Sequence, residues 1–234
     1  MKKLLLFRMQ DPINSKSLLT HPFYQAWQNG DLTLNVLRFY AKQYYFFESE
    51  FPLFLSSIHS KCQDRIVRQS VLENLWDEEH GDNNHRAMWL SFCGDLGLSE
   101  EDVVNAELHG KTQALIDAYK DICGLVSFQE SLAAMYAYEF QVPEISISQT
   151  EGLLSYYGFQ NDDSIRFFKE HGALDEEHSD REGESIVNHT SLEFDDAAEQ
   201  ALETALEAWW VFLDGVIPIR TGSYCLTNRV CYLN

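Results

Sequence analysis

The chain has 234 residues, of which 17 are basic and 37 acidic, so its formal net charge is −20. A surface this acidic repels phosphate groups, which excludes nucleic acid and anionic membranes as favoured partners. Hydrophobic residues make up 45% and charged residues 23% of the chain, which is ordinary for a globular protein and excludes disorder as its main state.

No apolar run approaches the ~20 residues that a membrane span needs, and the apolar stretch near the start ends at Arg8, too early for a signal peptide. The sequence therefore predicts a cytoplasmic protein. Its five cysteines are odd in number, widely spaced and without a CxxC pair, so neither a disulfide framework nor a zinc knuckle is expected. We expect Cys62, Cys93 and Cys123 to be buried free thiols.

Helical periodicity dominates the chain, and Pro and Gly are scarce. In the first half of the chain, helices are expected at 13–29, at 33–62 with a kink or break at Pro52, at 64–80, at 85–97 and from Ser99 onward. In the second half they are expected at 108–122, at 128–149 with a bend at Pro143, in a short segment punctuated by Gly152, Gly158 and Asn161, at 163–188 and at 195–214. The pattern predicts a single all-α domain of seven or more helices over residues 1–216, followed by a loose tail at 217–234.

One segment carries side chains that suit a metal. His171, Asp175 and His178 are spaced i, i+4 and i+7, which places all three on one face of a helix. Two imidazoles and a carboxylate are typical ligands of a borderline divalent metal such as iron or manganese. The alternative is a solvated polar face, because the segment is rich in acids.

A second segment, residues 77–85, holds several acids and two histidines around the turn signal at Gly81. Glu78 and His85 are the candidate ligands here. An acidic cluster is unfavourable at the C-terminal end of a helix unless a cation is near, which favours a metal over a solvated helix end. A third candidate is Glu139, a single carboxylate in a strongly apolar helix, which needs a partner if it is buried.

The three segments together supply three carboxylates and three imidazoles, enough for two metals with positions left open for dioxygen. The candidate ligands are Glu78, His85, Glu139, His171, Asp175 and His178. Thiolate ligands are absent from this set, which disfavours structural zinc. The paired Glu-x-x-His motifs of a ferritin-like di-iron bundle are absent too.

These residues stand in motifs that resemble the CADD-like family, named for the chlamydial protein associating with death domains. The resemblance runs from about His21 to Leu213. Its motifs are His21-Pro-Phe-Tyr24-x-x-Trp27, Tyr40-Ala-Lys-x-Tyr-Tyr45, Ile58-His-Ser-x-Cys62, Asn74-Leu-x-Asp-Glu-Glu79, Tyr138-Glu-x-Gln-x-Pro143 and His171-x-x-x-Asp175-x-x-His178. It implies a single seven-helix, heme-oxygenase-like bundle related to TenA and PqqC.

The resemblance also implies a function. It implies a dinuclear Fe/Fe or Fe/Mn site on the six candidate ligands, used with dioxygen and an external reductant. The implied product is 4-aminobenzoate, the aromatic part of folate, formed from the enzyme's own Tyr24, with Tyr40 as a second functional tyrosine. Related proteins suggest a homodimer.

One position departs from the family. The family has a lysine, implicated as the amino donor, ten residues after the ligand that matches Glu139, and this chain has Gln149 there. A neutral amide is not a ready source of an amine. The nitrogen therefore comes from elsewhere, or the protein oxidises a separate small substrate.

Three other functions remain open at the level of sequence. A TenA-like thiamin-salvage hydrolase would need a reactive thiol at Cys123 or Cys93. A helical binding protein without catalysis would need no metal at all. A haem protein would use His21 or His59 as an axial ligand.

Overall fold

The computed structural model describes residues 2–160, 162–189 and 195–217. Over these residues the chain is helical and has no strand, which confirms the all-α class. The elements are α1 (Lys2–Ser15), η1 (Leu18–Thr20), α2 (Pro22–Gln28), α3 (Leu34–Lys61), α4 (Arg65–Glu79), α5 (His85–Asp95), α6 (Glu100–Val104), α7 (Gly110–Leu125), α8 (Phe128–Glu139), α9 (Val142–Tyr156), η2 (Asp163–Ile165), α10 (Arg166–His189) and α11 (Asp195–Val216).

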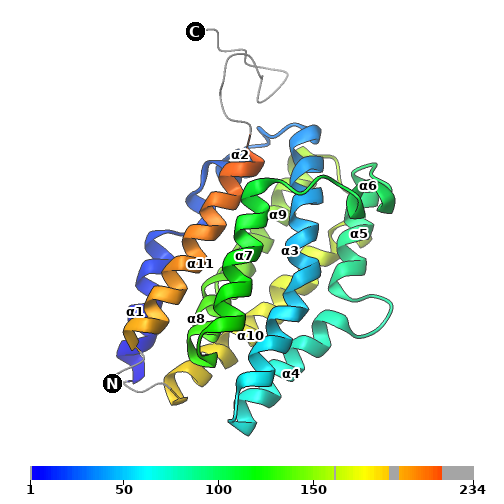
Figure 1. The fold of residues 1–234 in the computed structure, drawn as a ribbon. Helices are drawn as coiled ribbons and strands as arrows, with labels where there is room; N and C mark the ends of the chain where they lie inside the picture. The colour runs from blue at the N-terminus through cyan, green and yellow to red at the C-terminus, as the bar shows by residue number, and fades with distance from the viewer. Residues whose placement is uncertain (1, 161, 190–194, 218–234) are drawn as a thin grey trace.

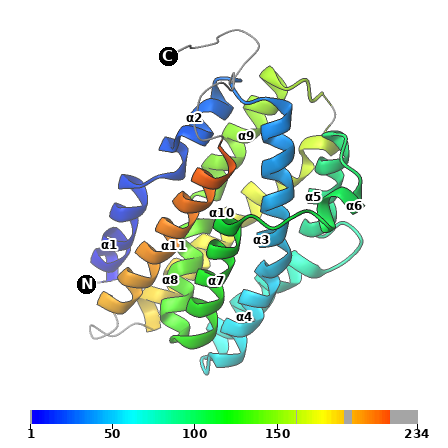
Figure 2. The same cartoon turned by 45° about the horizontal axis from the view of Figure 1, so that its top comes forward.

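The helices form a bundle in which α8 is enclosed by its neighbours (Figures 1 and 2). α8 packs against α11 and α10, while α3 packs against α7 and α4. Every residue from Ser131 to Glu139 in α8 is buried. A polar side chain on this helix therefore lies in the core and needs a partner there.

Two of the expected helices are each divided in the structure. The segment 13–29 contains the end of α1, the short η1 turn and α2, because a proline disfavours helical backbone at the residue before it. His21 instead caps α2: its Nδ1 accepts a hydrogen bond from the backbone N–H of Phe23 at 3.1 Å. The expectation of one helix over 13–29 is therefore wrong.

The expected helix at 128–149 is also divided, where only a bend was anticipated. α8 ends at Glu139, and Pro143 lies in the first turn of α9, where its missing N–H costs nothing. Pro52, in contrast, does not divide its helix, since α3 continues through it from Leu34 to Lys61. Gly152 lies inside α9 and does not end it.

The sequence also predicts buried free cysteines, a loose C-terminal tail and no membrane-spanning helix. Cys62, Cys93 and Cys123 are free and buried, as the sequence predicts. The tail expected at 217–234 lies, apart from Ile217, outside the described residues. Within the described part of the chain, none of the helices combines the length and the apolar character that crossing a bilayer demands.

Candidate metal centre

A cluster of buried ionisable side chains lies where α3, α4, α5, α8 and α10 meet. Each of these helices contributes at least one buried carboxylate or imidazole, and the set consists of Glu48, Glu78, His85, Glu139, His171 and His178. So many ionisable groups in one apolar core are costly unless they bind one another or a cation. The cluster is therefore the strongest candidate for a functional site.

Glu139 is at the end of α8 and is completely buried. Its Oε1 accepts a hydrogen bond from the side-chain Nδ2 of Asn74, on α4, at 3.0 Å. The neutral amide holds one carboxylate oxygen in place without neutralising its charge. The sequence-based expectation that Glu139 needs a partner in the core is consistent with this contact.

His178 lies on α10 and faces α4. Its Nε2 lies 3.1 Å from Oδ2 of Asp77, which is partly exposed. A carboxylate on one ring nitrogen fixes the orientation and tautomer of an imidazole, an arrangement that metal-binding histidines commonly use. Asp77 was not among the candidate ligands, although it belongs to the same acidic segment as Glu78.

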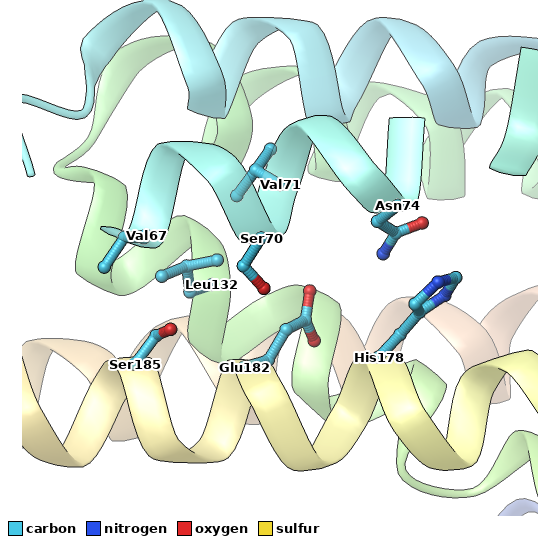
Figure 3. A pocket seen from close by; sticks show the side chains of 8 residues that line it. All are labelled: Val67, Ser70, Val71, Asn74, Leu132, His178, Glu182 and Ser185. Atoms are coloured by element: carbon cyan, nitrogen blue, oxygen red, sulfur yellow. The ribbon is translucent and has the colours of Figure 1, made fainter. Parts of the chain in front are cut away.

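A small cavity separates α4 from α10 beside these residues (Figure 3). Its volume is about 10 Å³, which is room for about one water molecule. In Figure 3, His178 and Glu182 rise from α10 towards α4, and Asn74 points back towards His178. Glu182 is also buried, so the polar face of α10 continues beyond the residues that the sequence singled out.

Glu78 and His85 meet across the turn between α4 and α5. Asn84 caps α5 by accepting a hydrogen bond from Ala87 N–H at 2.9 Å, and the reversal at Gly81 (φ +84°) turns the chain back on itself. Glu78 Oε1 consequently lies 2.8 Å from His85 Nδ1. The seven-residue spacing of Glu78 and His85 thus brings the two side chains together across a turn between two helices, and not along one continuous helix.

This short contact lacks hydrogen-bond geometry. Neither ring nitrogen of His85 has a hydrogen-bond partner among the described residues, and both are buried. Burial raises the pKa of Glu78 to about 8, with the acids at Asp77 and Glu79 adding to the rise and His178 opposing it. The Glu78 oxygen and the His85 nitrogen are buried, lie 2.8 Å apart and form no hydrogen bond. Two neighbouring ligand atoms of one cation, each bonded to it at ~2.1 Å, have a similar spacing of about 3 Å.

His171 lies on the His85 side of the cluster. The two imidazole rings are 4.9 Å apart, and His171 stacks on Phe167 with a centroid distance of 4.8 Å. Burial lowers the pKa of His171 well below its ordinary value of 6.5, and the neighbouring His85 and His178 lower it further. The neutral imidazole is the form that binds a metal.

Glu48 is the residue that the sequence analysis missed. One ligand atom each from Glu48, His85 and His171 lie within 4.8 Å of one another, and all three residues are buried. Glu48 interrupts a run of aromatic residues in α3, which is the same signal that singled out Glu139 in α8. A lone carboxylate among aromatic residues was therefore a signal for Glu48 as it was for Glu139.

Asp175 completes the set of sequence candidates. Its backbone lies in α10, four residues after His171, and its side chain lies outside the described residues. The structure thus brings together five of the six candidate ligands and adds Glu48. The chemistry of the donors, with oxygen and imidazole nitrogen and no thiolate, fits a borderline divalent metal.

Tyr24 and Tyr40 lie together in the core, on α2 and α3. Gln149 Nε2 donates a hydrogen bond to the Tyr40 oxygen at 3.3 Å, and each of the two tyrosines affects the pKa of the other. Burial raises the pKa of Tyr24 well above 10 and that of Tyr40 to about 12. The hydrogen bond from Gln149 and the interaction with Tyr24 lower the pKa of Tyr40, whereas the interaction with Tyr40 raises the pKa of Tyr24 further.

A face of α3 connects the tyrosines to the candidate ligands. Tyr40, Tyr44 and Glu48 are spaced by four residues, which places them in one row. The rings of Tyr40 and Tyr44 are 5.8 Å apart, and the hydroxyls of Tyr44 and Tyr138 are 2.6 Å apart. Tyr138 directly precedes the candidate ligand Glu139 in α8. The tyrosines therefore adjoin the cluster on two helices, next to Glu48 on α3 and next to Glu139 on α8.

The groups needed for the other open functions are less well placed. Burial raises the pKa of both Cys93 and Cys123 to about 12, which disfavours the thiolate that a nucleophile needs. His21 uses Nδ1 to cap α2, and its Nε2 lies 3.2 Å from Asp214. Both ring nitrogens of His21 are therefore engaged, which disfavours axial ligation of haem by His21.

Known proteins resemble this chain over most of its length. A family model, described as the TENA/THI-4/PQQC family, matches residues 9–217. A 4-aminobenzoate synthase of Nitrosomonas europaea is 37% identical over 234 residues, covering 94% of this chain and 91% of that protein. A 4-aminobenzoate synthase of Chlamydia pneumoniae is 34% identical over 205 residues, covering 88% of this chain and 91% of that protein.

The fold is found in solved structures as well. A domain of unknown function with a heme oxygenase-like fold from Shewanella denitrificans matches with a TM-score of 0.76 and 19% identity, over 92% of this chain and 90% of that chain. At this identity the likeness concerns the fold alone. The matches confirm the family resemblance and the heme-oxygenase-like bundle that the sequence motifs imply.

Proposed function

We propose that this chain, which belongs to the TENA/THI-4/PQQC family, is a metal-dependent oxidase that uses dioxygen to form 4-aminobenzoate from the ring of its own Tyr24. The curated relatives named 4-aminobenzoate synthase support the product. The buried tyrosine pair and the carboxylate–histidine cluster in one core support the chemistry.

The metal centre would be held by Glu78, His85, Glu139, His171, Asp175 and His178. The buried nitrogens of His85 and the close, non-hydrogen-bonded Glu78 oxygen support this assignment. Bound iron, alone or with manganese, supplies the one-electron chemistry with dioxygen that protein side chains cannot provide, and an external reductant completes the electron supply. Asp77 and Asn74 orient His178 and Glu139 from outside this set.

The observation that carries the proposal is the row Tyr40, Tyr44 and Glu48 on α3. It joins the Tyr24–Tyr40 pair to the side of the cluster formed by His85 and His171. A phenol and an oxidising centre within one dry core can exchange an electron without a diffusing intermediate. Tyr24 is only 4% exposed, so bulk water is excluded from its ring.

The hydrogen bonds around the tyrosines decide where protons are held. Tyr40 accepts a hydrogen bond from the Gln149 amide, and its pKa is raised less than that of Tyr24, so the Tyr40 oxygen bears negative charge more readily than that of Tyr24. Both hydroxyl groups keep their protons in the resting protein. Tyr40 can take up the Tyr24 proton during oxidation only by releasing its own, so it is expected to act as a proton relay and not as the final proton acceptor.

The test is intact-mass spectrometry of the full chain after anaerobic loading with iron, followed by reductant and air. We expect loss of the 4-hydroxybenzyl side chain, located at Tyr24 by peptide mapping, together with released 4-aminobenzoate. Tyr24→Phe should give neither the mass change nor the product, while Tyr156→Phe, at an exposed tyrosine, should behave as wild type. An unmodified chain that forms the product would overturn the role of Tyr24.

A second candidate function is oxidation of a separate small substrate, and Gln149 is the observation that favours it. The amide nitrogen of Gln149 is bonded to a carbonyl carbon and is not a nucleophilic amine, so this position cannot supply the amino group as a lysine could. Oxygen consumption by an iron-loaded chain that keeps its mass through many turnovers would support this function over self-consumption of Tyr24.

A further inference from the structure

Glu48 lies near the middle of α3 and is 3% exposed. One of its carboxylate oxygens belongs to a group of three ligand atoms, with one nitrogen each from His85 and His171, that are all within 4.8 Å of one another. The three residues come from α3, α5 and α10, which are far apart in sequence. The packing of three helices thus directs an oxygen and two imidazoles towards one point.

The spacing of these atoms is close to that required around a single ion. Donors with bonds of about 2.1 Å lie roughly 3 Å apart when adjacent and about 4.2 Å apart when opposite. A separation of up to 4.8 Å therefore closes with side-chain movements of under about 1 Å. Both nitrogens of His85 are buried without a hydrogen-bond partner among the described residues, so one of them is available for this contact.

We propose that Glu48 is a further ligand of the metal centre, binding the ion that His85 and His171 hold. The inference rests on the proposed function, since it requires a metal at this site, and it extends the ligand set to a carboxylate on α3. A carboxylate with two imidazoles suits Fe²⁺ or Mn²⁺. Glu48 and Tyr40 share one helix face, and the two residues are about 12 Å apart along the axis of α3.

The test compares metal binding by metal-free wild-type chain and a Glu48→Gln variant. Glu50→Gln is the matched control, because Glu50 is on the same helix but pairs with Lys120 at 3.0 Å. Titration with Mn²⁺, followed by electron paramagnetic resonance of the free ion, should show one site at least tenfold weaker in Glu48→Gln. The visible absorption of bound Co²⁺ should also change, while Glu50→Gln should match wild type in both measurements.

Thermal unfolding separates ligation from a structural role. Metal-free Glu48→Gln should unfold near the wild-type temperature but gain less stability from added Mn²⁺. If Glu48→Gln does not fold, Glu48→Asp decides, since it keeps the carboxylate but shortens it and should weaken the same site. Wild-type affinity and an unchanged Co²⁺ spectrum in the folded variant would overturn the role of Glu48 and leave the proposed function intact. A wild-type chain that binds no metal would overturn both.

Discussion

The side-chain amide of Gln149 on α9 donates a hydrogen bond to the hydroxyl oxygen of Tyr40 on α3, with 3.3 Å between the two atoms. This contact places a neutral amide beside the Tyr24–Tyr40 pair, where the family resemblance implies a lysine. The position is 5% exposed, so an amine from solvent reaches it only through movement of the surrounding helices.

Replacing Gln149 by Lys should supply the missing amine. We expect wild-type protein to depend on added ammonium or another amine for 4-aminobenzoate formation, and Gln149→Lys to form it without that addition. Product released after iron loading, reductant and air is measured by liquid chromatography. Gln149→Met is the control, because it fills similar volume without an amine. Equal product from wild type and Gln149→Lys, without added amine, would show that this position does not donate the nitrogen.

Metal loading should depend on the buried residues and not on the nearby exposed histidine. By analogy with two-metal sites, wild-type protein reconstituted with iron should hold about two ions per chain. His171→Ala and Glu139→Ala should each hold about one or fewer, because each loses a buried donor. His80→Ala is the control, since His80 is exposed and stacks on Trp76 at 3.9 Å. Metal analysis that finds the same loading in all four proteins contradicts the assignment.

Asp77 should act by positioning His178. Removing the carboxylate that lies 3.1 Å from Nε2 leaves the ring free to turn, so we expect Asp77→Ala to weaken metal binding by about 10–100-fold without abolishing it. Competition with a metal-binding dye measures this affinity. Asp82→Ala removes an exposed acid of the adjacent turn and should leave the affinity unchanged. A similar loss in both variants would indicate a general effect of charge.

Glu78 should make the stability of the metal-free protein depend on pH. Its pKa is raised by burial from 4.5 to about 8, so the folded state favours the protonated carboxyl. This contribution is fully present below about pH 4.5 and is lost as the pH rises through about 8, at a cost of a few kcal/mol. Bound metal should remove the loss, because the ion compensates the carboxylate.

Urea unfolding at about pH 5 and about pH 8 checks this expectation. Metal-free wild type should be less stable at the higher pH, and Glu78→Gln should show a smaller difference between the two. Glu73→Gln, an exposed acid on the same helix that pairs with Arg181, should keep the wild-type difference. Identical pH dependence in all three proteins would place the titrating group elsewhere.

Gly152 should be required for the packing of α9 against α2. A Cβ built at this position would lie 2.6 Å from Cδ1 of Trp27 and 3.2 Å from its backbone oxygen. We expect Gly152→Ala to destabilise the fold by about 1–3 kcal/mol through overpacking. Gly124→Ala meets nothing within 4 Å and should be neutral or stabilising, because alanine favours a helix. Thermal unfolding of both variants distinguishes the two outcomes.

The prolines show where sequence reasoning about the helices reaches its limit. Pro52 and Pro143 both interrupt apolar helical patterns, yet α3 continues through the first and the chain breaks before the second. A proline only removes a hydrogen bond and adds a local clash, so its effect depends on whether neighbouring helices hold the backbone in line. The packing of neighbouring helices is not encoded in the residues next to the proline.

The sequence by itself determined the all-α class, the helix start near His85, the family motifs and the helical row of His171 and His178, because these depend on residues within a few turns of one another. Only the tertiary structure decided that Glu78 meets His85 across a turn, that Asp77 holds His178 and that Glu48 from α3 joins the cluster. Contacts between helices depend on which faces pack together, and one helix's periodicity specifies its buried face but not the residue opposite it.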